Sequence, residues 1–291
     1  YMLSAKTFTF YLPPLYSFLI SWVYLFNNSV LSFFLIKLTN SILTSLIIFP
    51  AYFLAKEYLK KENIAFYTAV IISLLPSNFS YSAFVMAENL FNLLFITTVY
   101  TLYLGFKKNT NYLIISSILV LLCYATKITG IALFPIIILF TLTEKKYKKG
   151  LFVLILSLIL VILYTTLFGF NSSYNPVTRV FEEGRIQGLD ILLWAGVYIT
   201  LIYLQGFIIF TNSAFKSFRN NTLDRLFIIS IISFTGVAFY HTVTFVGIDG
   251  RPFERYMFCV IPLVIIMGIK NIKKFNINYL WALPISVAML Y

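Results

Sequence analysis

Apolar stretches recur from one end of this chain to the other, and no extended polar module separates them. Hydrophobic residues make up 60% of the 291 residues and charged residues only 11%, whereas roughly half of a typical soluble domain is apolar. A soluble core cannot bury that much apolar surface, but bilayer-spanning helices of about 20 apolar residues expose it to lipid. The sequence therefore predicts an all-α, polytopic transmembrane helical bundle.

The apolar runs and the polar breaks between them predict about ten helices. Several runs are shorter than the roughly 17 to 25 residues of a membrane span, so we expect their helices to extend into the loops or to break inside the protein. The short run 13–26 is rich in aromatic residues and is predicted to form an interfacial helix. The longer segments are 30–56, 64–78, 84–105, 111–126, 129–143, 150–168, 190–211, 226–247, 257–270 and 278 onward.

The stretch from Tyr112 to Leu142 fits one long tilted helix or two helices that meet at Thr126, Lys127 and Gly130. Cytoplasmic loops carry an excess of Lys and Arg, and only the two-helix interpretation collects most basic residues on one side. We therefore favour the hairpin. The residues that it places on the cytoplasmic side are Lys56, Lys60, Lys61, Lys107, Lys108, Lys145, Lys146, Lys148, Lys149, Lys216, Arg219, Arg225, Lys270, Lys273 and Lys274.

The formal net charge of +12 is compatible with nucleic acid binding, but this topology assigns the excess to cytoplasmic loops. On the outer side, where 169–189 is the longest predicted loop, bases and acids balance, so no nucleic acid partner is expected. Lys37 is left inside a helix. The outer bases are Lys6, Lys127, Arg179, Arg185, Arg251 and Arg255, and the outer acids are Glu88, Glu182, Glu183, Asp190, Asp249 and Glu254.

Glu88 lies near the outer end of the predicted helix 84–105. A lone carboxylate is costly to bury in a membrane, and two interpretations explain it. The acid can stabilise the helix start through the macrodipole while water reaches it. Alternatively, it faces a polar cavity, where it holds a divalent metal or orients a substrate. We favour the second interpretation, with Glu88 as the catalytic residue and as a metal ligand.

Three outer cations are candidate phosphate ligands. Lys127 at the hairpin apex is either a plain anchor that reaches the headgroups or a ligand for a phosphate. Arg251 and Arg255 lie in a short charged loop, where they either form a local salt-bridged turn or bind a phosphate through their planar guanidinium groups, with Asp249 or Glu254 steering their side chains. We expect all three to bind phosphate.

Four short elements follow one another in a fixed order on the predicted outer side. They are Pro13-Pro14-Leu15-Tyr16 before the interfacial helix, Met86-Ala87-Glu88-Asn89-Leu90 at a helix start, Thr126-Lys127 at the hairpin, and Glu254-Arg255-Tyr256 ahead of Pro262. In this order they resemble the GT-C superfamily of polytopic glycosyltransferases, and within it the branch of protein O-mannosyltransferases and aminoarabinose transferases. The resemblance covers most of the chain.

The resemblance implies a polyprenyl- or dolichyl-phosphate sugar as donor. It also implies an acidic residue in an outer loop before the Pro-Pro segment, acting as base or metal ligand. Residues 1–12 contain no Asp or Glu, so we expect this acid upstream of Tyr1 and the single domain 1–291 to be truncated at both ends. Relatives often carry Lys or His at the position of Leu12, so that phosphate or substrate contact is expected to be either absent or supplied by Lys37 or Lys127. The implied substrate-binding residues are Pro13, Pro14, Tyr16, Lys127, Arg251, Arg255 and Tyr256.

The predicted function is transfer of a sugar from the lipid carrier to a protein, lipid or glycan acceptor at the non-cytoplasmic face. Nucleotide sugars stay in the cytoplasm, so an outer-face transferase needs a lipid-linked donor. The expected location is the cell membrane of a prokaryote or the endoplasmic reticulum of a eukaryote. The alternative is a lipid or solute transporter, in which the same charges line a translocation path.

Overall fold

The computed structural model describes residues 13–168, 221–249 and 258–271. The chain divides into two compact units, Tyr1–Ser173 and Tyr174–Tyr291, and the described parts of both contain helices and turns but no strand. Three described segments are long and apolar enough to cross a membrane, namely Ser29–Leu59, Glu88–Lys107 and Tyr147–Phe168. The predicted all-α transmembrane class is therefore confirmed.

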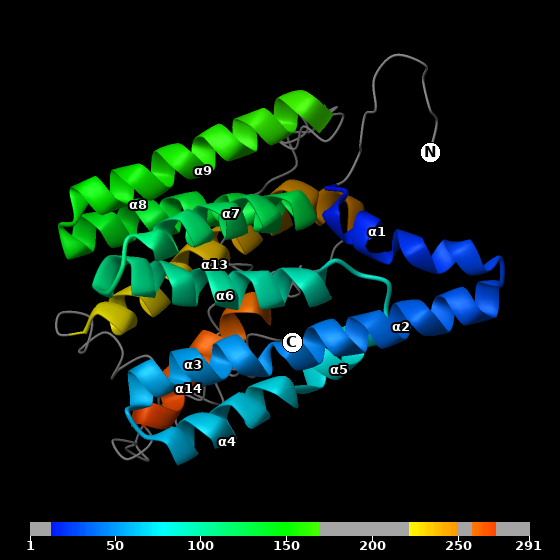
Figure 1. The fold of residues 1–291 in the computed structure, drawn as a ribbon, viewed down its shortest axis with the longest axis horizontal. Helices are drawn as coiled ribbons and strands as arrows, with labels where there is room; N and C mark the ends of the chain where they lie inside the picture. Colours follow the sequence, from blue (N-terminus) through cyan, green and yellow to red (C-terminus); the bar gives the residue numbers. More distant parts are fainter. Residues whose placement is uncertain (1–12, 169–220, 250–257, 272–291) are drawn as a thin grey trace. The chain divides into compact units, whose positions relative to one another are not determined.

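In the first unit, helices run back and forth along one another, with α7 between α6 and α9 (Figure 1). Neighbouring helices are joined by short turns, so consecutive chain segments pack together. The elements are α1 (Leu15–Ile20), the 3-10 helix η1 (Ser21–Phe26), α2 (Ser29–Leu46), α3 (Ile48–Leu59), α4 (Glu62–Ser73), α5 (Pro76–Ser82), α6 (Glu88–Lys107), α7 (Asn111–Thr126), the 3-10 helix η2 (Ile128–Ala132), α8 (Leu133–Glu144) and α9 (Tyr147–Phe168).

The short aromatic run before α2 forms α1 and η1, which fold back onto α2 (Figure 1). Asn27 ends η1 in the left-handed conformation at φ 48°. The Asn28 side chain then accepts a hydrogen bond from the Leu31 backbone N–H at 3.0 Å and so caps α2. Because the chain reverses here, α1 lies beside the helices of the first unit rather than extending away from them.

The predicted segment 30–56 is interrupted at Ile47, between α2 and α3. Pro50 has no N–H to donate to the carbonyl four residues earlier, at Leu46. In addition, the Ile47 N–H donates to the Thr44 carbonyl at 3.3 Å, one residue closer along the chain than in a regular α-helix. The break is thus local, and the two helices remain one apolar segment of 31 residues.

The start of α6 differs from the prediction. The apolar run favoured a helix from residue 84, with Glu88 one turn inside it, but α6 begins at Glu88. The residues before it form turns, a bend and an irregular segment, whose carbonyls are bonded by asparagine side chains from α2 and α6. These bonds replace those that another helical turn would have made.

The hairpin prediction is confirmed, because α7 ends at Thr126 and the chain turns through Lys127 into η2 and α8. Lys127 has an extended backbone with φ −155° and ψ 134°. A Cβ at Gly130 would lie 2.6 Å from the Tyr124 backbone nitrogen, so only glycine allows η2 to approach α7 this closely.

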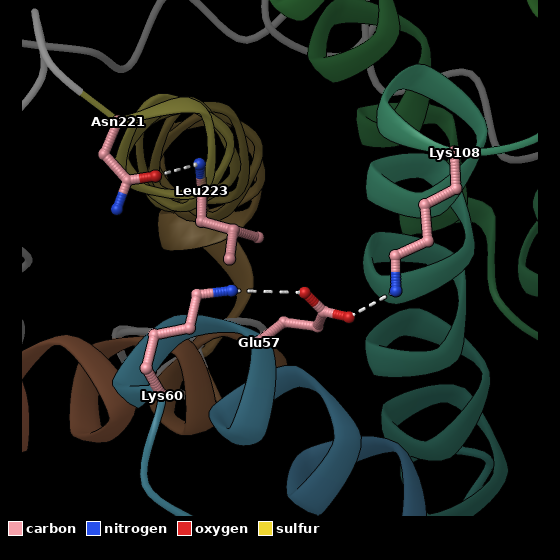
Figure 2. Close-up of polar contacts among 5 residues, drawn as sticks. All are labelled: Glu57, Lys60, Lys108, Asn221 and Leu223. Atoms are coloured by element: carbon pink, nitrogen blue, oxygen red, sulfur yellow. Dashed lines mark hydrogen bonds and ion pairs between the residues drawn. The ribbon is translucent and has the colours of Figure 1, made fainter.

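The basic loops of the first unit meet at one end of its helices. Glu57 forms ion pairs with Lys108 at 2.6 Å and with Lys60 at 3.4 Å (Figure 2). The hydrogen bond to Glu57 raises the pKa of Lys108. Lys146 and Lys149 each donate to a carbonyl at the end of α6, at 2.8 Å. Glu88 at the start of α6 and Lys127 after the end of α7 lie at the other end of these two helices, away from the basic loops.

The described part of the second unit contains α13 (Thr222–Asp249), the 3-10 helix η4 (Phe258–Val260) and α14 (Ile261–Asn271). The Asn221 side chain accepts a hydrogen bond from the Leu223 N–H at 3.1 Å at the start of α13 (Figure 2). Lys270 near the end of α14 pairs with the buried Asp224 at 3.5 Å. The start of α13 therefore lies beside the end of α14, as expected for two antiparallel helices.

Candidate active site

Glu88 and Lys127 form a buried ion pair. The Lys127 Nζ lies 2.9 Å from Glu88 Oε1, and their side chains are only 15% and 7% exposed. Lys127 Nζ also lies 6.0 Å from the centre of the Phe91 ring. Glu88 occupies the first turn of α6, where the helix dipole stabilises a negative charge. The pair therefore joins the start of α6 to the end of α7, two positions 39 residues apart.

Asparagine side chains fix the segment that leads into Glu88. Asn89 donates to the Tyr81 carbonyl at 3.0 Å and to the Met86 carbonyl at 3.2 Å. Its Oδ1 accepts a hydrogen bond from the Thr44 hydroxyl of α2 at 3.1 Å. Buried carbonyls need such partners, so these bonds set where α6 can begin.

Tyr16 in α1 reaches the same region. Its hydroxyl donates to Asn40 Oδ1 at 2.9 Å, and its ring belongs to an apolar cluster with Ile36 of α2 and Leu90 of α6. Burial raises the pKa of the Tyr16 phenol, and the nearby Glu88 carboxylate adds to the rise. Pro14 is buried just before α1. The segment of the predicted Pro-Pro-Leu-Tyr motif thus lies against the start of α6.

Pro13 is partly exposed at the edge of the described residues. Arg251, Arg255 and Tyr256 lie outside the described residues. Their convergence with Lys127 on one phosphate therefore stays a prediction. The predicted outer loop 169–189 also lies outside the described residues.

The sequence interpretation did not select Asn40 and Thr44, which hold the site together from α2. A signal was available, since two polar residues four positions apart within an apolar run share one helix face. Such a pair can equally face a neighbouring helix or bond to its own helix, and composition does not distinguish these arrangements.

The described residues alone do not make a metal site. Hard divalent cations take several oxygen ligands, whereas no three His, Cys, Asp or Glu side chains gather in the described parts of the chain. Glu88 contributes one carboxylate, which is already paired with Lys127. The divalent metal expected at Glu88 stays a prediction.

Residues 12–168 match the family described as dolichyl-phosphate-mannose-protein mannosyltransferase. The chain belongs to this family. The match covers more than half of the chain and includes every described element of the first unit. The predicted membership in the mannosyltransferase and aminoarabinose transferase branch of the GT-C superfamily is confirmed, and this family member is an integral membrane protein.

Two solved structures resemble this mannosyltransferase-family chain. Both are of ArnT from Cupriavidus metallidurans, one bound to undecaprenyl phosphate and one in the apo state. Each covers 97% of this chain with a TM-score of 0.55, at 15% and 14% sequence identity. At this identity the likeness concerns the fold. The chain spans about half of ArnT, since 53% of that chain is covered, and no curated protein matches it.

Proposed function

We propose that this chain is part of a membrane glycosyltransferase that moves a sugar from a polyprenyl- or dolichyl-phosphate carrier to an acceptor. The observation that carries the proposal is the buried Glu88–Lys127 pair, placed where α1, α6 and α7 meet in a chain of the mannosyltransferase family. An ion pair in an apolar environment is costly. Its place beside the Pro-Pro-Leu-Tyr segment supports a role in binding a charged substrate.

In the proposed reaction the acceptor attacks the anomeric carbon and the bond from this carbon to the phosphate oxygen breaks. Negative charge then builds on the lipid phosphate. A fixed cation stabilises that charge more than it stabilises the intact donor, which is how it accelerates the step. We assign this role to Lys127, with Arg251 and Arg255. An ammonium has several N–H donors, so Lys127 can bond to a phosphate while Glu88 orients it.

Glu88 thereby sets the position of the phosphate ligand, and it can also orient the acceptor. Tyr16, Tyr256 and the two prolines are proposed to contact the carrier or the sugar. A divalent cation at Glu88 is a further proposal, and the phosphate contacts proposed for Lys127, Arg251 and Arg255 do not depend on it. A carboxylate base in an outer loop is proposed to remove the proton from the acceptor hydroxyl.

We place the reaction on the non-cytoplasmic side. The lysine-rich loops gather at one end of the helices of the first unit, through contacts such as Lys108 to Glu57 and Lys149 to the end of α6. An excess of lysine is typical of the cytoplasmic side. Glu88 and Lys127 lie at the other end of α6 and α7, which supports an outer site for a lipid-linked donor.

Turnover of a polyprenyl-phosphate sugar by the full-length protein in liposomes tests the proposal. Lys127→Met should lower kcat/KM roughly 10²- to 10³-fold, the scale for losing one preorganised donor. Arg255→Ala should lose about as much, and Arg255→Lys should recover part of it, because a point charge does not replace a bidentate grip. Lys148→Met, at an exposed lysine of the basic loops, is the control and should retain turnover.

Wild-type turnover by Lys127→Met would remove Lys127 from the mechanism. Passage of the lipid or sugar across the membrane with the sugar–phosphate bond intact would support the transporter instead.

A further inference from the structure

Asn40 is an unusual residue for its position. It lies within α2, in an apolar membrane segment, and is 0% exposed. Burying an amide is unfavourable unless its donor and acceptor are both satisfied. Both are satisfied here, since Oδ1 accepts from the Tyr16 hydroxyl at 2.9 Å and Nδ2 donates to the Phe84 carbonyl at 2.8 Å.

The two partners of Asn40 lie far apart in the sequence. Tyr16 is 24 residues before it, in α1, and Phe84 is 44 residues after it, in the segment that leads into α6. A single amide therefore joins three parts of the chain. Two of them are candidate substrate-binding or catalytic parts, namely the Pro-Pro-Leu-Tyr segment and the segment that carries Glu88.

Thr44 repeats this connection one helical turn further along α2. Its hydroxyl donates to Asn89 Oδ1 at 3.1 Å, and Asn89 directly follows Glu88. Residues four apart share one face of a helix, so Asn40 and Thr44 form one polar edge of α2 against the start of α6. The buried face of α2 thus forms hydrogen bonds with residues on both sides of Glu88.

We infer that Asn40 is a positioning residue of the site, which holds Tyr16 of α1 and the Phe84–Glu88 segment in register through one buried amide. Glu88 in turn orients Lys127, so a shift of α1 relative to α6 would move the carrier-binding segment and the phosphate ligand apart. This inference rests on the proposed function and adds to it the residue that sets the geometry. Asn40 itself touches no reacting group.

The test compares Asn40→Ala with a matched control, Asn78→Ala, in the full-length protein. Asn78 is also a buried asparagine, 7% exposed, and its Nδ2 donates to the Ile72 carbonyl at 2.8 Å. That bond closes the turn between α4 and α5 and does not reach Tyr16 or Glu88. Asn40→Ala removes two side-chain hydrogen bonds and Asn78→Ala removes one, so both should lower the Tm, Asn40→Ala by more.

Turnover should separate the two variants. Asn40→Ala should lower kcat roughly 10- to 100-fold, the scale for a small misplacement of reacting groups, with a much smaller change in KM for the lipid-linked sugar. Asn78→Ala should leave kcat at the wild-type value.

Asn40→Leu is the second variant, because leucine refills the volume and keeps the packing if the alanine variant does not fold. It should show the same loss of kcat. Equal kcat for wild type and Asn40→Leu, or equal loss of kcat in Asn40→Ala and Asn78→Ala, would overturn the inference. Lys127→Met distinguishes the two proposals. If it lowers turnover while Asn40→Leu does not, only the positioning role fails, and if it retains turnover the proposed function fails first.

Discussion

Glu88 and Glu57 of the first unit both form ion pairs, but the Glu88 pair is buried and the Glu57 pair lies at the surface. The Glu88 and Lys127 side chains are 7% and 15% exposed, whereas those of Glu57 and Lys108 are 20% and 56% exposed. Water screens the second pair, and exposed pairs stabilise proteins by about 1 kcal/mol or less. Removing one partner of a buried pair leaves an uncompensated charge.

We expect Glu88→Gln to lower the free energy of unfolding by about 3 to 5 kcal/mol, the range for breaking a buried pair. Glu57→Gln should cost less than about 1 kcal/mol. Reversible unfolding in detergent micelles measures both. The double variant Glu88→Gln/Lys127→Met removes both charges and should regain much of the stability without regaining turnover. Restored turnover in this variant would show that the pair serves the fold alone.

At the scale of helices, the basic loops do more than mark a membrane side. Lys149 donates to the Gly105 carbonyl at 2.8 Å and Lys146 to the Phe106 carbonyl at 2.8 Å. These carbonyls belong to the last turn of α6, which has no further helical N–H to bond. The start of α9 therefore caps the end of α6, where a positive charge also complements the helix dipole.

Lys149→Met should lower the free energy of unfolding by about 1 kcal/mol, since a cation near a helix C-terminus contributes roughly 0.3 to 2 kcal/mol. Lys148→Met is the control, because Lys148 is exposed in the same turn and should change stability little. Thermal unfolding of both variants, compared at low and high salt, measures the difference. An equal Tm for the two variants would contradict the capping role.

The helices could be predicted to different degrees. Apolar runs located most spans, and loop charge correctly divided Tyr112–Leu142 into α7 and the η2–α8 segment. The start of α6 was predicted four residues early, because apolarity continues through Phe84 and Val85. Bonds from Asn40 and Asn89 stop the helix there, and they depend on which helix lies opposite. The local sequence pattern does not show which helix packs against residues 84–88, so the start of α6 could be found only from the tertiary contacts.

At the scale of the whole molecule, the family match and the apolar helices establish an integral membrane protein, and the side of the site depends on topology. Nucleotide-activated and lipid-linked donors are available on different faces, so orientation decides which donor is accessible. The lysine-rich end and the Glu88–Lys127 end of α6 and α7 differ in charge. The positive-inside rule applies to loops this short.

Cysteine labelling in intact cells tests this orientation. Lys148→Cys, at an exposed position in the first turn of α9, should react with a membrane-impermeant maleimide only after permeabilisation, whereas Ala83→Cys, exposed after α5, should react from outside. Both native cysteines, Cys123 and Cys259, are buried, so background labelling should be low. Arg179→Cys should behave like Ala83→Cys, and Lys216→Cys like Lys148→Cys.

Labelling of Lys148→Cys and Ala83→Cys from the same side would refute the topology. Exclusive labelling of Lys148→Cys from outside would place Glu88 and Lys127 at the cytoplasmic face, where a lipid carrier presented on the outer side could not reach them.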